Sequence, residues 1–166
     1  MLAEGHRRVK VRLLPPPDDD SGKSAPKHVV ERATNYIEKY GLVEDDQLWL
    51  VMDVDCWSKD LLIDIGKECQ EKNGWNIALS NPCFEVWLHS HLQDIAQMST
   101  KTCKELKGNL HHLISGGYKV EAFITLVDSA LERATIADKD NGHFFPTEMT
   151  TKVYLLVDEI KQFFQN

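Results

Sequence analysis

Two aspartates, Asp53 and Asp55, stand one residue apart directly after the apolar run "LWLVM" at residues 48–52. A carboxylate pair in this position is either an ordinary polar end of a strand or a set of ligands for a metal ion that acts on phosphate. If the chain stays extended, both side chains point to the same side, which suits an oxygen-ligated Mg²⁺ or Mn²⁺ ion. The spacing alone leaves both interpretations open.

A second group of polar residues, "SNPCFE" at 80–85, follows the next apolar segment at 75–80. Asn81 is expected to cap a helix that Pro82 opens. Its amide and the positive end of that helix would then be available to orient a phosphate. Glu85, one turn into the helix, would add a catalytic carboxylate.

Two histidines of this helix lie on different faces. His91 shares a face with the apolar residues Trp87 and Leu88, which predicts a buried, structural histidine. His89 shares the side of Glu85, because residues four apart are neighbours on a helix surface. We therefore expect His89 to be the more exposed of the two.

The elements that must position these residues alternate along the first half of the chain. Residues 8–14, 48–53 and 75–80 have the apolar content of strands, and residues 26–40 and 58–72 between them have helical patterns. Crossovers of this length predict a parallel, right-handed α/β sheet with 48–53 as the central strand. Since parallel strands end at the same edge of a sheet, the acids that follow two of them are expected to share a crevice there.

After the third strand, the pattern is helical only. Helices are expected at about 99–114, 118–137 and 149–164, in addition to the one that contains Glu85. The predicted organisation is an α/β part over residues 1–95 and a helical part over 96–166, within one compact domain.

Size and charge restrict the classes of protein that the chain can belong to. Its 166 residues, 42% of them apolar, suffice for one domain with a core, and the formal charge of −7 excludes a uniformly basic surface for nucleic acid. Local basic groups remain at residues 6–12 and at Lys101, Lys104 and Lys107, whose spacing of three places them along one side of a helix. Charge runs are usually solvated faces, but bound divalent cations would offset acidic charge where a phosphate approaches.

The chain has no apolar stretch of the roughly 18 to 20 residues that a bilayer requires, and its start lacks the apolar centre of a secretory signal. Four cysteines occur without a CxxC pair, which is typical of reduced thiols in a cytoplasmic protein. We expect a cytoplasmic protein without a membrane partner.

The strand "LWLVMDVD", a helix and then "IALSNPCFEVWLHSHL" resemble the RloB family, bacterial proteins with a Toprim-like domain linked to antiphage defence and restriction loci. The similarity extends over residues 8 to 164 and includes "GYKVEAF" at 117–123 and "TTKVYLLVDEI" at 150–160. The family signature is a strand ending in D-x-D, followed some two dozen residues later by S-N-P-C-F-E-x-W-L-x-x-H. This chain supplies Ser80, Asn81, Pro82, Cys83, Phe84, Glu85, Trp87, Leu88 and His91.

The resemblance implies a Toprim-like fold and Mg²⁺-dependent phosphodiester chemistry, with Asp53 and Asp55 as metal ligands and His91 supporting the site. The chain departs from the family pattern at its start. Family members usually open with an apolar strand that runs into Glu-Gly, then Thr-Glu and a helix, whereas Glu4-Gly5 is followed directly by "HRRVKV". Either Glu4-Gly5 is a remnant and the following helix is missing, or the first strand and its acid are absent. In both cases we expect this chain to have little or no nuclease activity.

Three hypotheses follow. The first is a Mg²⁺-dependent nuclease acting on DNA or RNA, with Glu85 as a further acid or base. The second is a catalytically incomplete α/β module that docks a partner defence protein. The third, phosphoryl transfer through Asp53, is weaker because Trp57 stands where D-x-D phosphatases usually carry Thr or Val.

Overall fold

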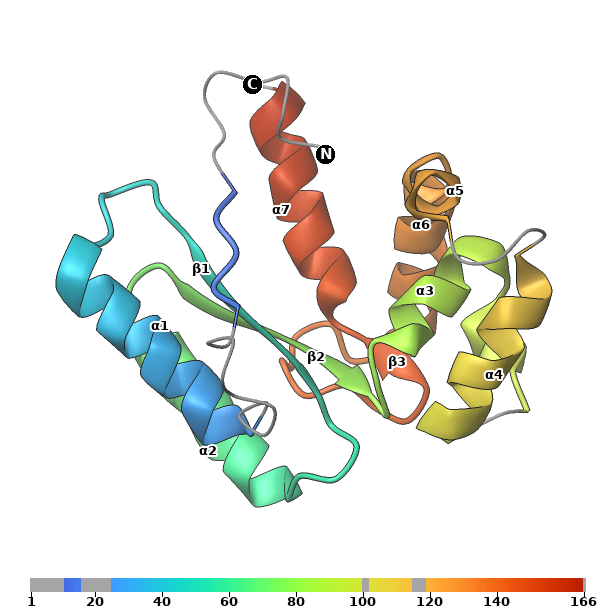
Figure 1. The fold of residues 1–166 in the computed structure, drawn as a ribbon, viewed down its shortest axis with the longest axis horizontal. Helices are drawn as coiled ribbons and strands as arrows, with labels where there is room; N and C mark the ends of the chain where they lie inside the picture. Colours follow the sequence, from blue (N-terminus) through green and yellow to red (C-terminus); the bar gives the residue numbers. More distant parts are fainter. Residues whose placement is uncertain (1–10, 16–24, 100–101, 115–118, 166) are drawn as a thin grey trace.

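The computed structural model describes residues 11–15, 25–99, 102–114 and 119–165. It is a mixed α/β structure whose strands lie in the first half of the chain, apart from one short strand near the end (Figure 1). The elements are α1 (Pro26–Tyr40), β1 (Leu48–Asp53), α2 (Lys59–Glu71), β2 (Trp75–Asn81), α3 (Glu85–Leu92), the 3₁₀ helix η1 (Ile95–Gln97), α4 (Cys103–Leu113), α5 (Val120–Ile124), α6 (Val127–Ala137), β3 (Thr150–Thr151) and α7 (Val153–Gln165).

The sheet has the strand order β1-β2-β3. Strands β1 and β2 are parallel, with Leu48 opposite Trp75 and Asp53 opposite Ser80, as the crossover through α2 predicts. Strand β3 is antiparallel to the end of β2, with Thr151 opposite Ser80. The expectation of three parallel strands around 48–53 is therefore wrong for the described residues, where β2 is the middle strand.

The first expected strand, 8–14, is not present in its described part. Residues 11–15 run past β1 without joining the sheet, and residues 8–10 lie outside the described residues, as do Glu4 and Gly5. The side chain of Arg12 explains this position. Its guanidinium donates a hydrogen bond to the Tyr36 hydroxyl (3.2 Å) and lies over the Tyr36 and Tyr40 rings, which ties the segment to α1.

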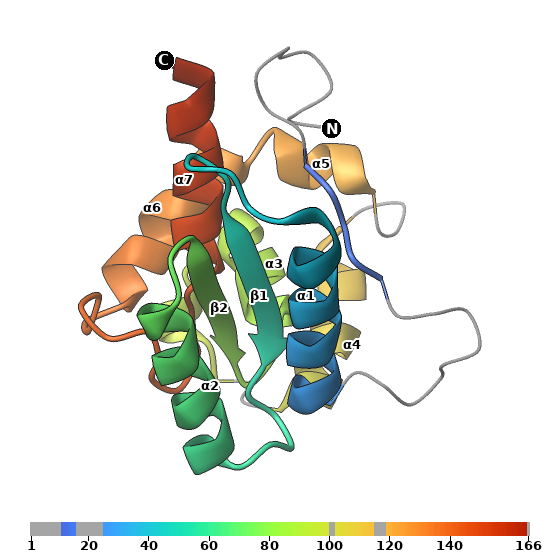
Figure 2. The ribbon, with the colours of Figure 1, turned by 90° about the vertical axis from the view of Figure 1, so that its left-hand side faces the viewer.

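Helices cover both faces of the sheet, with α1 and α2 on one side and α7 with the α3–α6 group on the other (Figures 1 and 2). Alternate residues of the strands serve the two layers. Leu50, Ile77 and Leu79 pack with the α1–α2 layer, whereas Ala78 packs with the opposite layer. Because both faces are covered, the successive residues Ile77, Ala78 and Leu79 of β2 are all buried.

Local signals account for the helix limits in the first half of the chain. Helix α1 has the predicted bounds, with Pro26 in its first turn and Gly41 after its end at a φ of 72°. Helix α2 begins after Ser58, whose hydroxyl accepts a hydrogen bond from the Leu61 backbone N–H (3.2 Å). Its apolar residues Leu62, Ile65 and Cys69 are buried, whereas Leu61 is exposed.

Two helices in the second half of the chain have different limits from those predicted. The helix expected at 118–137 is divided into α5 and α6, because the Thr125 hydroxyl donates to the Ala122 carbonyl and the chain turns before it continues. The helix expected at 149–164 begins only at Val153, since the preceding residues form β3. No helix within the described residues has both the length and the apolar character needed to cross a membrane.

Candidate acidic site at the sheet edge

The candidate site lies beyond the carboxyl ends of β1 and β2. The chain after β1 remains bonded to the chain after β2, because the Val54 N–H donates to the Ser80 carbonyl (2.9 Å) and the Asp55 N–H to the Pro82 carbonyl (2.8 Å). These bonds bring residues 53–55 against residues 80–83, which are distant in sequence. The expectation that the two segments meet at one sheet edge is confirmed.

Asp53 connects the two segments through its side chain. One carboxylate oxygen, Oδ1, accepts a hydrogen bond from the Phe84 backbone N–H (2.8 Å) at the start of α3. Helix α3 begins at Glu85, three residues later than predicted. The carboxylate of Asp53 thus satisfies an N–H at the helix N-terminus, where negative charge is stabilised.

Asn81 does not cap this helix, contrary to the prediction. It is the last residue of β2, where it pairs with Thr150, and its amide donates to the Pro146 carbonyl (3.3 Å). The peptide bond between Asn81 and Pro82 is cis. The reason for the wrong prediction is that β2 extends one residue further than expected and the helix starts later. A role for Asn81 in orienting phosphate stays a prediction.

Burial and the neighbouring charged groups shift the pKa of Asp53. Burial is the main effect that raises the pKa of Asp53, and the Phe84 N–H opposes it. The carboxylates of Glu85 and Asp55 also raise this pKa, whereas the ammonium group of Lys107 lowers it. Asp53, Asp55 and Glu85 therefore belong to one electrostatic site that contains a lysine.

Lys107, on α4, is the residue of this site that sequence reasoning did not assign. Its Nζ lies 3.8 Å from Glu85 Oε1, and the two side chains are 62% and 17% exposed. The lysine thus reaches from the solvent side toward a largely covered carboxylate. The spacing of Lys101, Lys104 and Lys107 was visible in the sequence, but nothing in it indicated that α4 packs beside α3.

Two thiols also lie at the site. Cys83 and Cys103 are hydrogen-bonded to each other, and Cys103 contacts the carboxylate of Asp55. Burial raises the pKa of both thiols, which keeps them in the protonated form. The contact places the start of α4 against the loop between β2 and α3.

The donor atoms at the site match the preference of Mg²⁺ for oxygen. Across the parts of the chain that the structure describes, no three or more His, Cys, Asp or Glu side chains form a group that could hold a metal ion. Mg²⁺, however, keeps several of its water molecules and is commonly bound through one or two carboxylates. Asp53, Asp55 and Glu85 supply carboxylates of this kind at one sheet edge, and metal binding by these residues stays a prediction.

Both histidines of α3 are buried, so the prediction for His91 is confirmed and that for His89 is wrong. His91 is 4% exposed, and its Nδ1 is 2.9 Å from the Trp87 carbonyl oxygen. His89 is fully buried because α4 covers its side of the helix. Its Nε2 lies 2.9 Å from the Leu106 carbonyl oxygen. The sequence pattern of α3 alone could not show that a second helix packs on this face.

A buried ion pair closes the loop between α6 and β3. Lys152 and Asp138 have fully buried side chains, and Lys152 Nζ lies 2.5 Å from Asp138 Oδ2. Lys152 also donates to the Asp140 carbonyl (2.7 Å), and the Tyr154 hydroxyl donates to Asp138 Oδ2 (2.7 Å). Since this loop supplies the Pro146 carbonyl that binds Asn81, the pair fixes one wall of the sheet edge.

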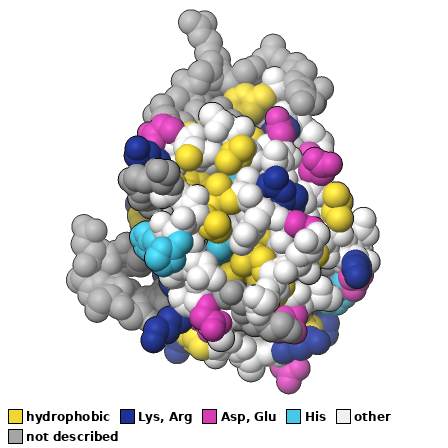
Figure 3. Space-filling view, turned by 90° about the vertical axis from the view of Figure 1, so that its right-hand side faces the viewer, with side chains coloured by type: hydrophobic (Ala, Val, Ile, Leu, Met, Phe, Trp, Pro, Cys, Tyr) yellow, Lys and Arg dark blue, Asp and Glu magenta, His cyan; other side chains and the backbone are white. Residues whose placement is uncertain are grey.

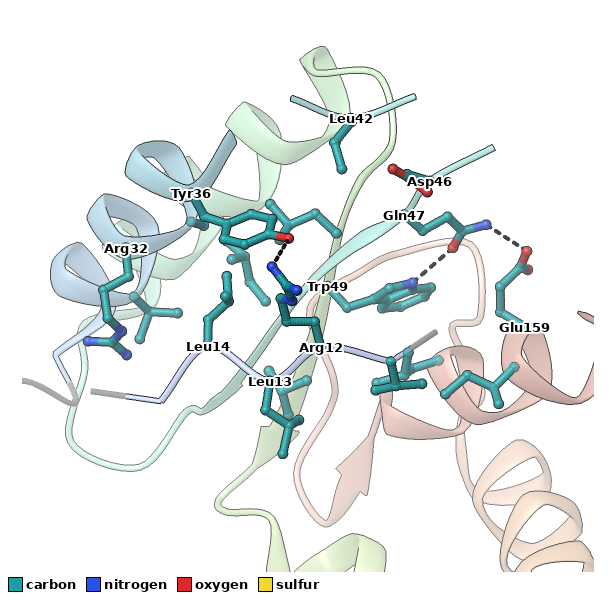
Figure 4. A pocket seen from close by; sticks show the side chains of 18 of the residues that line it. Arg12, Leu13, Leu14, Arg32, Tyr36, Leu42, Asp46, Gln47, Trp49 and Glu159 are labelled. Atoms are coloured by element: carbon teal, nitrogen blue, oxygen red, sulfur yellow. Dashed lines mark hydrogen bonds between the residues drawn. The ribbon is translucent and has the colours of Figure 1, made fainter. Parts of the chain in front are cut away.

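A groove within the described residues is separate from the acids. It has a volume of about 660 Å³ and lies along β1 between α1 and α7, where residues 11–14 border it (Figure 4). Trp49 donates a hydrogen bond to Gln47 (2.9 Å), which donates in turn to Glu159 of α7 (2.7 Å). This chain of contacts joins β1 to α7 at one end of the groove.

Comparison with known proteins adds a family. No curated protein and no solved structure matches the sequence at a significant level. The family model described as "RloB-like protein" matches residues 3–160, which is nearly the whole chain. The match includes the two strands, the acids that follow them and the helical second half. The chain therefore belongs to the RloB-like protein family.

Proposed function

We propose that this protein is a Mg²⁺- or Mn²⁺-dependent nuclease of the Toprim type that acts in the cytoplasm as part of a bacterial antiphage defence system. Its substrate is a phosphodiester of DNA or RNA, and a partner defence protein acts with it. The observation that carries the proposal is the electrostatic coupling of Asp53 to Glu85 and Asp55 at the carboxyl edge of two parallel strands. Membership of the RloB-like family supports it.

The proposed roles follow from the contacts. Asp53, held in place by the Phe84 N–H, and Asp55 would hold the metal through carboxylate oxygens. Once bound, the ion would neutralise charge on the phosphate and lower the pKa of a water molecule. Glu85, partly covered beside α4, accepts a proton from the attacking water as the phosphorus–oxygen bond of the diester breaks. The leaving oxygen takes its proton from solvent.

The test compares single substitutions that remove charge without changing shape. Asp53→Asn, Asp55→Asn and Glu85→Gln are incubated with single-stranded DNA, double-stranded DNA and RNA in Mg²⁺ or Mn²⁺. Asp64→Asn is the matched control, because Asp64 is exposed on α2 and away from the site. We expect cleavage that needs the metal, is unchanged in the control and falls by at least about 100-fold when a catalytic carboxylate is lost. Equal activity in all four variants refutes the proposal, and no cleavage by the starting protein favours the module without catalysis that is described next.

A second candidate function is an interaction module without catalysis. The groove along β1 favours it, because a strand edge beside an apolar groove is a common site for an extended peptide. Val51, on β1 within this groove, is 41% exposed. If the protein is an interaction module, we expect that, in a host carrying the complete defence locus, Val51→Lys abolishes protection from phage and Asp53→Asn does not. If it is a nuclease, we expect the reverse.

A further inference from the structure

Helix α4 is held firmly against α3. Thr102 and Glu105 form a capping box at its start, with the Thr102 hydroxyl accepting from the Glu105 N–H (3.3 Å). Leu106 and Leu110 are buried beneath it. The Leu106 carbonyl oxygen lies 2.9 Å from His89 Nε2 of α3. The side of α4 that faces away from this contact therefore has a fixed position relative to the acids.

Basic side chains lie along the outer side of α4. Lys104, Lys107 and His111 are exposed and spaced three and four residues apart, which places them in one row on the helix. Figure 3 shows the face of the molecule that α4 occupies, where basic, acidic and apolar side chains are interspersed rather than gathered in one basic patch. What distinguishes Lys107 within this row is its contact with Glu85.

The contact between Lys107 and Glu85 is a weak one. At 3.8 Å it is an ion pair without a direct hydrogen bond, and the lysine side chain is mostly exposed. Exposed pairs of this kind contribute little to stability, because water and salt screen them and the long side chain keeps its freedom. Lys107 can therefore leave Glu85 without a large loss of folding free energy.

We propose that Lys107 binds a backbone phosphate of the nucleic acid substrate, and that it exchanges Glu85 for this phosphate when a divalent cation occupies the acidic site. The inference rests on the proposed function and extends it by assigning the residue that positions the substrate. It also indicates the path of the substrate, because its backbone must then cross the surface where α4 meets the start of α3.

The charges explain both halves of the exchange. Without a cation, the ammonium group of Lys107 offsets the negative charge of Glu85 and Asp53. A divalent cation takes over that role and repels the ammonium group. A phosphate then brings negative charge to the same place, and lysine is a common binder of phosphate as a point charge. Lys107 thus opposes cation binding in the free protein and favours nucleic acid binding.

The effects of Lys107 on cation binding and on nucleic acid binding are therefore expected to be opposite, and both can be measured. Lys107→Gln removes the charge, Lys107→Arg keeps it, and Lys67→Gln is the matched control, since Lys67 is exposed on α2. The first measurement is the affinity for Mn²⁺ alone, by titration calorimetry. We expect Lys107→Gln to bind Mn²⁺ several-fold more tightly than the starting protein, and the control to bind it equally.

The second measurement is the binding of a fluorescein-labelled oligonucleotide in Ca²⁺ at several salt concentrations, with single-stranded DNA, duplex DNA and RNA in parallel. Lys107→Gln should bind several-fold more weakly to whichever probe binds. The slope of log affinity against log salt should fall by about 1, as expected for the loss of one phosphate contact. Lys107→Arg should retain the slope.

The inference stands only if Lys107→Gln strengthens Mn²⁺ binding and weakens oligonucleotide binding, with the control unchanged in both. Any other combination overturns it, including weaker nucleic acid binding with unchanged Mn²⁺ affinity. Its failure is distinguishable from failure of the proposed function. The latter is measured as metal-dependent cleavage that requires Asp53, whereas these titrations need no cleavage.

Discussion

Asp53 has two roles that place different demands on one carboxylate. It accepts the Phe84 N–H at the start of α3, which an uncharged amide could also do. Its burial and, to a smaller extent, the two neighbouring acids favour the uncharged form. Folding the chain with an ionised Asp53 therefore costs free energy that a neutral residue would not. Such costs are common where a residue serves function rather than stability.

We predict that Asp53→Asn raises the free energy of unfolding at pH 7 by about 0.5 to 2 kcal/mol. The pKa of Asp53 is raised in the folded protein, so its contribution is favourable below the ordinary value of 3.8 and is lost as pH rises through the folded value. Asparagine escapes that loss, and the difference should vanish in acid. Urea denaturation at several pH values measures it. A variant less stable than the starting protein at pH 7 contradicts the prediction.

His91 should make the protein sensitive to acid. Burial lowers the pKa of His91, so the unfolded chain takes up a proton first and stability is lost as pH falls below the ordinary value of 6.5. His91→Phe keeps an aromatic ring between Trp87 and Phe123, whose ring centroids lie 4.7 and 5.2 Å away. As pH falls below 6.5, we predict that the free energy of unfolding decreases less steeply in the variant than in the starting protein, by up to about 1.4 kcal/mol per pH unit.

Denaturation curves between pH 5 and pH 8 provide the measurement for His91. His111→Gln is the control, because His111 is exposed near the end of α4. Stability profiles of His91→Phe and the starting protein that run parallel over this range would show that His91 is not the group responsible.

At the residue scale, the sequence correctly predicted the contacts that follow from the shared edge of two parallel strands. Asp53 and the start of the next helix were expected to meet, since both follow parallel strands, and they do. Lys107 and His89 depend instead on the packing of α4 against α3, which periodicity within one helix cannot reveal. Lys152 was missed because a lysine side chain is normally exposed.

At the scale of elements, the buried pair of Lys152 and Asp138 determines the position of a whole loop. We predict that Lys152→Met lowers the free energy of unfolding by about 3 to 5 kcal/mol, because it leaves a buried carboxylate without its cation. The double variant Lys152→Met with Asp138→Leu should recover most of that loss. The comparison is made by urea denaturation at pH 7.

Lys161→Met is the control for that experiment, because Lys161 pairs with the exposed Asp128 and should contribute no more than about 1 kcal/mol. Equal effects of Lys152→Met and Lys161→Met would mean that burial does not govern the contribution of the pair. A double variant as unstable as Lys152→Met alone would mean that the loop needs the ion pair itself.

Element limits were predictable where a capping residue or proline marks them, as at Ser58 and Pro26. They were not predictable where long-range contacts decide. Thr150 and Thr151 form a strand only because the end of β2 lies beside them, and a two-residue strand has no periodicity to detect. At the division between α5 and α6, the Thr125 hydroxyl competes for the Ala122 carbonyl. The sequence does not reveal this, because threonine also occurs within continuous helices.

At the scale of the whole molecule, residues of both parts distinguished in the sequence pack in one of the buried clusters. Ala78 of β2 packs with Val153 and Tyr154 at the start of α7. We predict that a chain ending at residue 95 does not unfold cooperatively, because one face of the sheet would lose the helices that cover it. Circular dichroism during urea denaturation tests this, with the full chain as control. A sigmoidal transition in the short chain would show that residues 1–95 fold alone.

The hydrogen bond between the Ser80 and Thr151 hydroxyls joins residues 71 positions apart in the sequence. During synthesis, it can form only after the ribosome has added the second of these residues. Ribosomes add about 5 to 20 residues per second, so β2 waits about 4 to 14 seconds for the strand that completes its edge. During that interval the nascent chain exposes apolar sheet surface that the finished protein covers. The yield of folded protein in a cell should therefore respond to chaperone supply and translation speed even where equilibrium stability is unchanged.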